Sequence, residues 1–234
     1  MRDTQLIFVE GLPGSGKTTT ASWLASRLQS ERLMVNLFLE HQPEHPLNVG
    51  GNLHPSGDTT GEAFFQCYTS ASFVQESLQR WQVFVRAALQ AEAISVLDSY
   101  PFQNTVRVLL QLNATPDCMR EYAGQVEALV MPLQPVLIYF NQRDLIHAFH
   151  NLSNISAQRG KAWTDYVVEL VTHCPYAMAR HLEGFSGALA VISDYKQLTD
   201  SLLRQSRCPR IVLEDCAGGW EGCYQQIEAF LGLA

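Results

Sequence analysis

The residues with the clearest chemistry form a glycine-rich motif near the amino terminus. Residues 11–18 read Gly-Leu-Pro-Gly-Ser-Gly-Lys-Thr and match the pattern G-x-x-x-x-G-K-[ST]. Glycines in such a loop let successive backbone N–H groups point at an anion, and the following helix adds its dipole. Lys17 would reach the β- and γ-phosphates of a nucleoside triphosphate, and the Thr18 hydroxyl would ligate Mg²⁺. The motif predicts a nucleotide site made by these residues: Gly11, Pro13, Gly14, Ser15, Gly16, Lys17, Thr18 and Thr19.

The flanking sequence favours this interpretation over a chance match in a glycine-rich turn. An apolar run at residues 6–9 precedes the motif and predicts a strand, and a helical stretch at residues 17–29 follows it. Strand, loop and helix in this order are the context that the motif requires. Glu10, between the strand and the motif, is expected to hold the loop rather than to react.

A second candidate for metal binding follows the apolar run at residues 94–97. Open α/β sheets bind ligands at the carboxyl ends of their strands, and a metal held by Thr18 commonly has a strand-end carboxylate nearby. We therefore expect Asp98 to hold Mg²⁺ through water, as a Walker B-like aspartate. The alternative is an aspartate that caps a helix or turn, because Pro101 follows shortly afterwards.

The elements that must position these residues alternate along the chain. Strands are predicted for five short apolar runs, at residues 6–9, 34–39, 94–97, 136–140 and 211–213. Their apolar residues are consecutive, which is typical of strands covered on both faces. Helices are predicted at residues 17–29, about 73–92, within 106–130, at 144–152 and at 220–231. We expect an α/β fold, a P-loop NTPase three-layer sandwich in which helices flank a five-stranded parallel sheet.

Composition narrows the class of protein. The chain has 234 residues, 47% hydrophobic and 17% charged, with a formal net charge of -7. The length suits a single domain over residues 1–234, and the acidic balance argues against nucleic-acid binding. No apolar stretch is long enough for a membrane span or a signal peptide. We expect a cytoplasmic protein, with a homodimer left open, whose six cysteines form no C-x-x-C pair and are reduced thiols.

The stretch from Glu10 to Thr19 resembles the opening of P-loop kinases of the nucleoside and nucleotide kinase group, including thymidylate kinases and deoxynucleoside kinases. In length and element order the chain also resembles a poorly characterised set of bacterial kinase-like P-loop proteins. The resemblance implies an ATP- and Mg²⁺-dependent kinase. It also implies a role for Glu40, which closes the second strand, because a carboxylate there often contacts the acceptor hydroxyl and takes its proton. An ordinary strand-end carboxylate is the alternative for Glu40.

Other polar residues are candidates for contacts with the acceptor. The amides of Gln103 and Asn104, just beyond Asp98, could contact a hydroxyl or a base edge, although Asn104 could instead cap a helix. Arg80, beside an apolar helix face, could approach an anionic group or form a surface salt bridge. The irregular segment at about residues 41–61 is expected to be a loop over the site. Its His41 and His45 either compete with Glu40 or are solvated.

Three cations follow the fourth predicted strand in this acidic protein: Arg143, Arg159 and Lys161. Cations of this kind stabilise charge on a transferring phosphoryl group when a closing segment brings them in. We expect a lid at about residues 151–163, with Arg159 as its catalytic residue and Arg143 as a substrate ligand; a solvated helix end and turn is the alternative. The chain lacks the Arg-dense lid of adenylate-kinase-like enzymes, which weakens the case for a nucleoside monophosphate acceptor.

Together these features favour a kinase that transfers the γ-phosphoryl group of ATP to a polar small molecule, such as a nucleoside, nucleotide, antibiotic or other metabolite. One alternative is a regulatory ATPase or switch that signals to a protein partner. Another is a binding module that has lost its chemistry. A GTPase is disfavoured because residues 141–144 read Asn-Gln-Arg-Asp and lack the lysine of the N-K-x-D motif.

Overall fold

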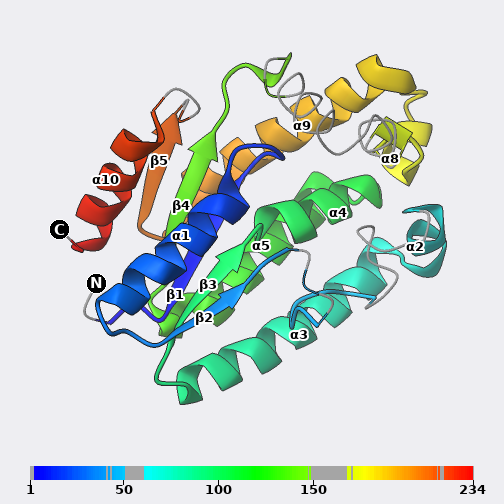
Figure 1. The fold of residues 1–234 in the computed structure, drawn as a ribbon. Coiled ribbons are helices and arrows are strands. Elements are labelled where there is room, and N and C mark those ends of the chain that lie inside the picture. Colours follow the sequence, from blue (N-terminus) through cyan, green and yellow to red (C-terminus); the bar gives the residue numbers. More distant parts are fainter. Residues whose placement is uncertain are drawn as a thin grey trace.

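The computed structural model describes residues 3–40, 42, 44–50, 61–146, 148, 168–169, 171–214, 216 and 219–233. Strands alternate with helices along these residues (Figure 1). The strands are β1 (Leu6–Gly11), β2 (Val35–Phe38), β3 (Ile94–Asp98), β4 (Val136–Asn141) and β5 (Arg210–Glu214). The helices are α1 (Lys17–Ser30), α2 (Gly61–Cys67), α3 (Ser70–Gln90), α4 (Arg107–Gln111), α5 (Pro116–Val130), α8 (Pro175–Met178), α9 (Gly184–Gln205) and α10 (Trp220–Leu231), with a π-helical turn η2 (Phe102–Val106) and a 3₁₀ turn η3 (Met131–Leu133).

The five strands form one parallel sheet in the order β2-β3-β1-β4-β5 (Figure 1). This confirms the α/β class and the five-stranded parallel sheet. The central strand β1 pairs with β3 and β4, and Val9 lies opposite Asp98 in the first of these ladders. Because all strands run the same way, their carboxyl ends lie at one edge of the sheet, where ligands bind in open α/β folds.

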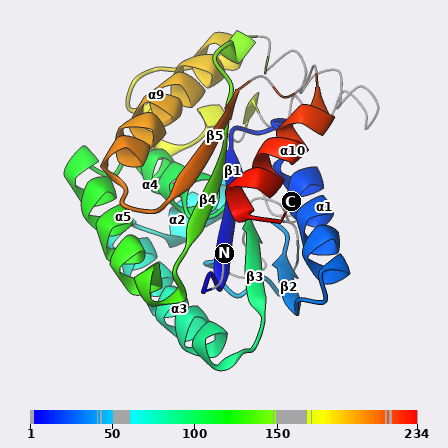
Figure 2. The ribbon, with the colours of Figure 1, turned by 90° about the vertical axis from the view of Figure 1, so that its left-hand side faces the viewer.

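Helices cover both faces of the sheet (Figure 2). Alternate residues of a strand point to opposite faces, and β1 follows this rule. Ile7 and Val9 belong to the apolar cluster shared with α1 and α10, whereas Leu6 and Phe8 belong to the cluster shared with α3, α5 and α9. The consecutive apolar residues that predicted two-sided burial are therefore divided between two cores.

Local signals in the sequence account for several helix starts. The Thr69 side chain accepts a hydrogen bond from the backbone N–H of Ser72, and the Ser72 hydroxyl in turn lies 3.0 Å from the backbone nitrogen of Thr69. This reciprocal cap satisfies backbone donors at the start of α3. The Thr115 side chain caps α5 by accepting one hydrogen bond, from the backbone N–H of Cys118, and Pro116 occupies the first turn, where a missing N–H costs nothing.

The structure also differs from the sequence prediction. Helix α9, Gly184–Gln205, was not expected. Its buried residues Val191, Tyr195 and Leu202 recur at helical spacing, so the sequence carries a helical pattern here that the prediction overlooked. Of the helix expected at residues 144–152, residues 144–146 and 148 are described, and residues 145, 146 and 148 are helical. Among the described residues, we find no helix with the length and apolar character needed to cross a bilayer.

The cysteine prediction was wrong for two of the six residues. Cys216 and Cys223 are joined by a disulfide, whereas Cys67, Cys118, Cys174 and Cys208 are free thiols. The pair brackets the start of α10, and a separation of seven residues does not by itself predict that its two Cα atoms lie 6.0 Å apart. Only the fold brings the two sulfur atoms together.

Candidate phosphate and carboxylate site

Residues 11–18, which we call the glycine-rich loop, connect the end of β1 to the start of α1. Gly14 and Gly16 have φ values of 76° and 91°, a left-handed conformation that glycine adopts without the strain imposed by a Cβ atom. Space is also limited at Gly16, where a Cβ atom would lie 2.1 Å from the Trp220 ring at the start of α10. Glycine is therefore required for both conformation and packing in this loop.

The loop ends in a helix start that suits an anion. Gly16 is the residue before α1, and no side chain caps the helix there. The backbone N–H groups of a first helical turn lack partners within the helix and favour negative charge. Lys17 is only 4% exposed, and its ammonium donates to the carbonyl of Leu12 over 3.0 Å. This bond uses one of three ammonium donors.

Thr18, on the first turn of α1, meets Asp98 at the end of β3. The Thr18 hydroxyl donates to Asp98 Oδ2 over 2.6 Å. Asp98 is fully buried, and burial raises the pKa of its carboxyl, opposed by the nearby Lys17 charge and the Thr18 hydrogen bond. The two residues predicted to bind a metal are thus brought together, and Asp98 does not cap a helix.

Glu40 also joins this group of side chains. Ser99 Oγ lies 3.0 Å from Asp98 Oδ1 and 3.0 Å from Glu40 Oε2, so its single proton can be donated to either carboxylate. The Gln103 side-chain amide donates to both oxygens of Glu40, over 2.9 and 3.0 Å. The result is a continuous polar chain, which we call the carboxylate chain, through these five residues: Thr18, Asp98, Ser99, Glu40 and Gln103.

Sequence reasoning missed Ser99, the middle member of the carboxylate chain. This residue has a φ of 67° and is fully buried. A left-handed conformation in a residue other than glycine costs free energy, and such residues concentrate at functional sites. The backbone then continues into η2, and π-helical turns are also common at functional sites. A serine after an aspartate carries no sequence signal of either feature.

Residues 44–50, which belong to the expected acceptor loop, pack against Tyr100, the residue after Ser99. The imidazole of His45 stacks on the Tyr100 ring with centroids 4.5 Å apart, and the Tyr100 hydroxyl donates to Asn48 over 2.6 Å. His45 is 3% exposed, so the interpretation of a solvated histidine was wrong. Residues 44–50 contain no helix or strand, as expected, whereas His41 and residues 51–60 lie outside the described residues.

Of the cations predicted to contact the substrate, the structure describes Arg80 and Arg143, and their ion pairs are with residues outside the carboxylate chain. Arg80 forms an ion pair with Glu76 one turn earlier on α3, which matches the salt-bridge alternative. Arg143 pairs with Glu214 at the end of β5, and this hydrogen bond lowers the pKa of the Glu214 carboxyl. Arg159, Lys161 and the whole lid expected at residues 151–163 lie outside the described residues. Their roles stay predictions.

Asn104 is buried on η2, next to Gln103. Its backbone N–H donates to the carbonyl of Ser99, so it helps to fix the turn after β3. Gln103 instead directs its side-chain amide at Glu40 from the same turn. Of the two amides predicted to face the acceptor, Gln103 is therefore the one that belongs to the carboxylate chain.

Within the part of the chain that the structure describes, no group of three or more His, Cys, Asp or Glu side chains could hold a metal. A magnesium ion in a phosphate loop does not need such a group, because it keeps several waters and takes its other ligands from phosphates and one or two side chains. Thr18 and Asp98 fit that requirement, since the threonine oxygen retains lone pairs while its proton goes to the carboxylate.

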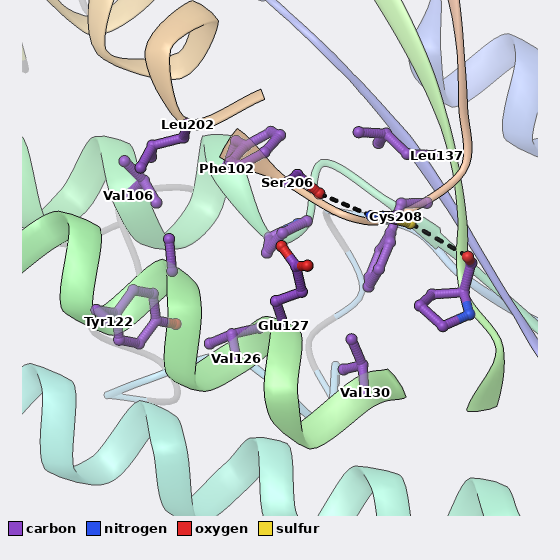
Figure 3. Close-up of a pocket in the computed structure, with 14 residues that line it drawn as sticks. Phe102, Val106, Tyr122, Val126, Glu127, Val130, Leu137, Leu202, Ser206 and Cys208 are labelled. Carbon is purple, nitrogen blue, oxygen red and sulfur yellow. Dashed lines mark hydrogen bonds between the residues drawn. The ribbon is translucent and has the colours of Figure 1, made fainter. Parts of the chain in front are cut away.

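The structure also contains a cavity that is separate from the carboxylate chain (Figure 3). It lies between α5 and α9, and its walls are mainly apolar, with Tyr122, Val126, Leu137 and Leu202 among them. It includes none of the residues of the glycine-rich loop and neither Glu40 nor Asp98. We therefore assign the candidate site to the carboxyl ends of β1 and β3 rather than to this cavity.

Comparison with protein families and with curated proteins found no match. The geometry of the glycine-rich loop and of the carboxylate chain therefore carries the functional conclusion.

Proposed function

We propose that this protein is an ATP-dependent phosphotransferase of the P-loop NTPase class, which transfers the γ-phosphoryl group to a hydroxyl of a polar small molecule. One observation carries the proposal: the carboxylate chain links Thr18, the last residue of the glycine-rich loop, to Glu40 after β2 and to Gln103 on η2. The proposed phosphate-binding element and the candidate base would thus be held in one hydrogen-bonded unit. Phosphoryl transfer needs mainly such positioning, together with charge stabilisation.

On the nucleotide side, the backbone N–H groups of the glycine-rich loop and the first turn of α1 would bind the phosphates of ATP. Lys17 would turn from Leu12 toward the β- and γ-phosphates, where its charge offsets the charge that develops during transfer. Thr18 would ligate Mg²⁺, and Asp98 would hold the metal through water. Bound Mg²⁺ supplies charge neutralisation on the phosphate oxygens.

On the acceptor side, Glu40 would orient the attacking hydroxyl and accept its proton. A carboxylate accepts hydrogen bonds only, so the acceptor hydroxyl must donate to it. Gln103 and Ser99 hold Glu40 from two directions, which fixes the carboxylate against the end of β3. A positioned base of this kind contributes about 10²- to 10⁴-fold to a rate.

Other parts of the proposal rest on the sequence alone. Arg159 would stabilise the transferring phosphoryl group from a lid, and Arg143 and Arg80 would have to leave their present ion pairs to bind a substrate. The proposed location is the cytoplasm, a compartment in which the Cys216–Cys223 disulfide is unusual.

The experiment that tests the proposed function measures ADP release from Mg-ATP with a panel of acceptors that includes nucleosides, nucleotides, aminoglycosides and other polar metabolites. We expect release that depends on one class of acceptor and that is lost in Lys17→Ala. An exposed cation on α3, Arg86, provides the matched control Arg86→Ala, which should behave as wild type. Acceptor-independent hydrolysis would favour an ATPase or switch instead, and absence of turnover would favour a binding module.

A further inference from the structure

Glu10 is a buried carboxyl that the proposed transfer does not use. It occupies the next-to-last position of β1, directly before the glycine-rich loop, and it is fully buried. Burying a carboxyl is costly unless its oxygens are hydrogen-bonded. Burial raises the pKa of Glu10 to about 8, opposed by the Lys17 charge and by three backbone N–H groups. Such a residue needs a structural or functional explanation.

The partners of Glu10 lie on two different elements. Its Oε2 accepts from the backbone N–H of Gly11, the first residue of the glycine-rich loop, over 3.2 Å. Its Oε1 accepts from the backbone N–H groups of Phe102 and Gln103, the latter over 3.2 Å. Glu10 therefore connects the loop to the first turn of η2, across more than ninety residues of sequence.

The first turn of η2 depends on this distant carboxyl. Pro101, which precedes the turn, offers no side-chain cap to its N–H groups. Free N–H groups at the start of a helical segment need acceptors when they are buried. Glu10 supplies the acceptor from β1, so it replaces the cap that the local sequence does not provide.

The position of η2 in turn determines the surroundings of Glu40. Gln103, whose backbone N–H binds Glu10, donates through its side-chain amide to both oxygens of Glu40. A displacement of this turn would move the Gln103 amide away from Glu40. It would also disturb Ser99, whose carbonyl accepts from the N–H of Asn104 on the same turn.

We propose that Glu10 is a positioning residue that holds the acceptor side of the site in register with the glycine-rich loop through the backbone of Phe102 and Gln103. This inference rests on the proposed phosphotransferase function. Glu10 is not itself the base, because its oxygens face backbone N–H groups and are closed to solvent. Its effect reaches the acceptor through Gln103 and Glu40.

Three variants test this role. Glu10→Met keeps a similar side-chain length and removes both acceptor oxygens. Glu10→Gln keeps one carbonyl oxygen, which can still accept from Phe102 and Gln103. Glu92→Gln changes an exposed carboxylate before β3 and is the matched control. For each protein, kcat, the KM for the acceptor and the Kd for ATP are measured, and circular dichroism verifies the fold.

In Glu10→Met we expect kcat over acceptor KM to fall about a hundredfold, because small displacements of reacting groups have effects of this size. The ATP Kd should stay within about threefold of wild type, since the loop keeps its own glycines and Lys17. In Glu10→Gln, kcat over acceptor KM should be at least about tenfold higher than in Glu10→Met, because the amide oxygen restores the acceptor for η2.

Three results would overturn the inference. Unchanged acceptor kinetics in Glu10→Met would show that η2 needs no such link. An equal loss of ATP affinity and of transfer would mean that Glu10 supports the glycine-rich loop alone. The same conclusion would follow if Glu10→Gln had a kcat over acceptor KM no higher than that of Glu10→Met. If Glu10→Met does not fold, the Glu10→Gln variant is decisive. A change in the acceptor KM without a change in the ATP Kd supports the inference, and equal changes in both contradict it. A wild-type protein without transfer would instead remove the proposed function, and this inference with it.

Discussion

The hydroxyl of Thr18 donates a hydrogen bond to Asp98 over 2.6 Å, although eighty residues separate them in the chain. Parallel pairing of β1 with β3 makes this possible, because Val9 lies opposite Asp98 and the glycine-rich loop then turns back over the ends of both strands. The contact joins a hydroxyl of the glycine-rich loop to a buried carboxylate, which is the arrangement that the proposed Mg²⁺-nucleotide site needs.

Replacing Asp98 tests the metal part of the proposal. Asp98→Asn keeps an acceptor for Thr18 and removes the negative charge that would hold Mg²⁺ through water. Loss of such an outer ligand weakens metal affinity by about 10- to 100-fold. We expect the Mg²⁺ concentration that gives half-maximal transfer to rise by this factor. Asp117→Asn, at an exposed position on α5, is the control, and equal Mg²⁺ curves for the two variants would contradict the assignment.

Replacing Glu40 tests the acceptor part. Glu40→Gln removes a proton acceptor and leaves the glycine-rich loop untouched, so transfer should fall about 10²-fold or more while the ATP Kd is unchanged. Glu92→Gln, an exposed carboxylate before β3, should retain full activity. Kinetics with the acceptor and binding of a fluorescent ATP analogue measure the two effects separately. A Glu40→Gln enzyme with normal transfer would exclude Glu40 as the base.

The buried Glu10 predicts a pH dependence of stability. Its pKa is about 8 in the folded protein and near 4.5 in an unfolded chain, so folding takes up a proton between these pH values. The free energy of unfolding therefore falls as pH rises through this range, with a limiting slope of about 1.4 kcal/mol per pH unit from this one group. Above about pH 8 both states are ionised and the slope vanishes.

Denaturant unfolding of wild type and Glu10→Gln between pH 5 and pH 9 measures this effect. The amide introduced by this substitution does not titrate, so the difference in stability between the two proteins isolates the contribution of Glu10 from that of other groups. We expect wild type to lose stability relative to the variant as pH rises toward 8. Parallel stability curves would mean that Glu10 ionises normally in the folded protein.

The disulfide gives a prediction that does not depend on function. Unreduced, denatured protein should react with four equivalents of a thiol reagent, and reduced protein with six. A crosslink that closes so short a loop stabilises by roughly 2 kcal/mol in the chain-entropy model. Reductant should thus lower the melting temperature of wild type and leave a Cys216→Ser, Cys223→Ser double variant unchanged. Six reactive thiols before reduction would exclude the bond.

Sequence predicted the features that local patterns determine. Residue types and their spacing predicted the glycine-rich loop. Runs of consecutive apolar residues predicted strands that are buried on both faces. Asp98 and Glu40 could be placed at strand ends because each follows an apolar run. They could be placed near each other because the carboxyl ends of parallel strands share one edge of the sheet. The prediction of a parallel five-stranded sheet was confirmed for these reasons.

Features that depend on tertiary contacts were not predictable. Ser99, which has a left-handed backbone conformation, joins Asp98 to Glu40 through its hydroxyl. Gln103 reaches Glu40 from a turn that is held by Glu10, a residue more than ninety positions away. Solvation was one of the two interpretations of His45, but its ring stacks on Tyr100, which nothing in its own segment shows.

The most direct test of the central claim follows the γ-phosphoryl group of labelled ATP. Wild type and Lys17→Ala are incubated with Mg-ATP labelled in that group and with the acceptor panel, and the products are separated and weighed by mass spectrometry. The proposed function predicts that wild type places the label on a hydroxyl of one acceptor class and that Lys17→Ala does not. Label found only in inorganic phosphate, or remaining in ATP with every acceptor, would contradict it.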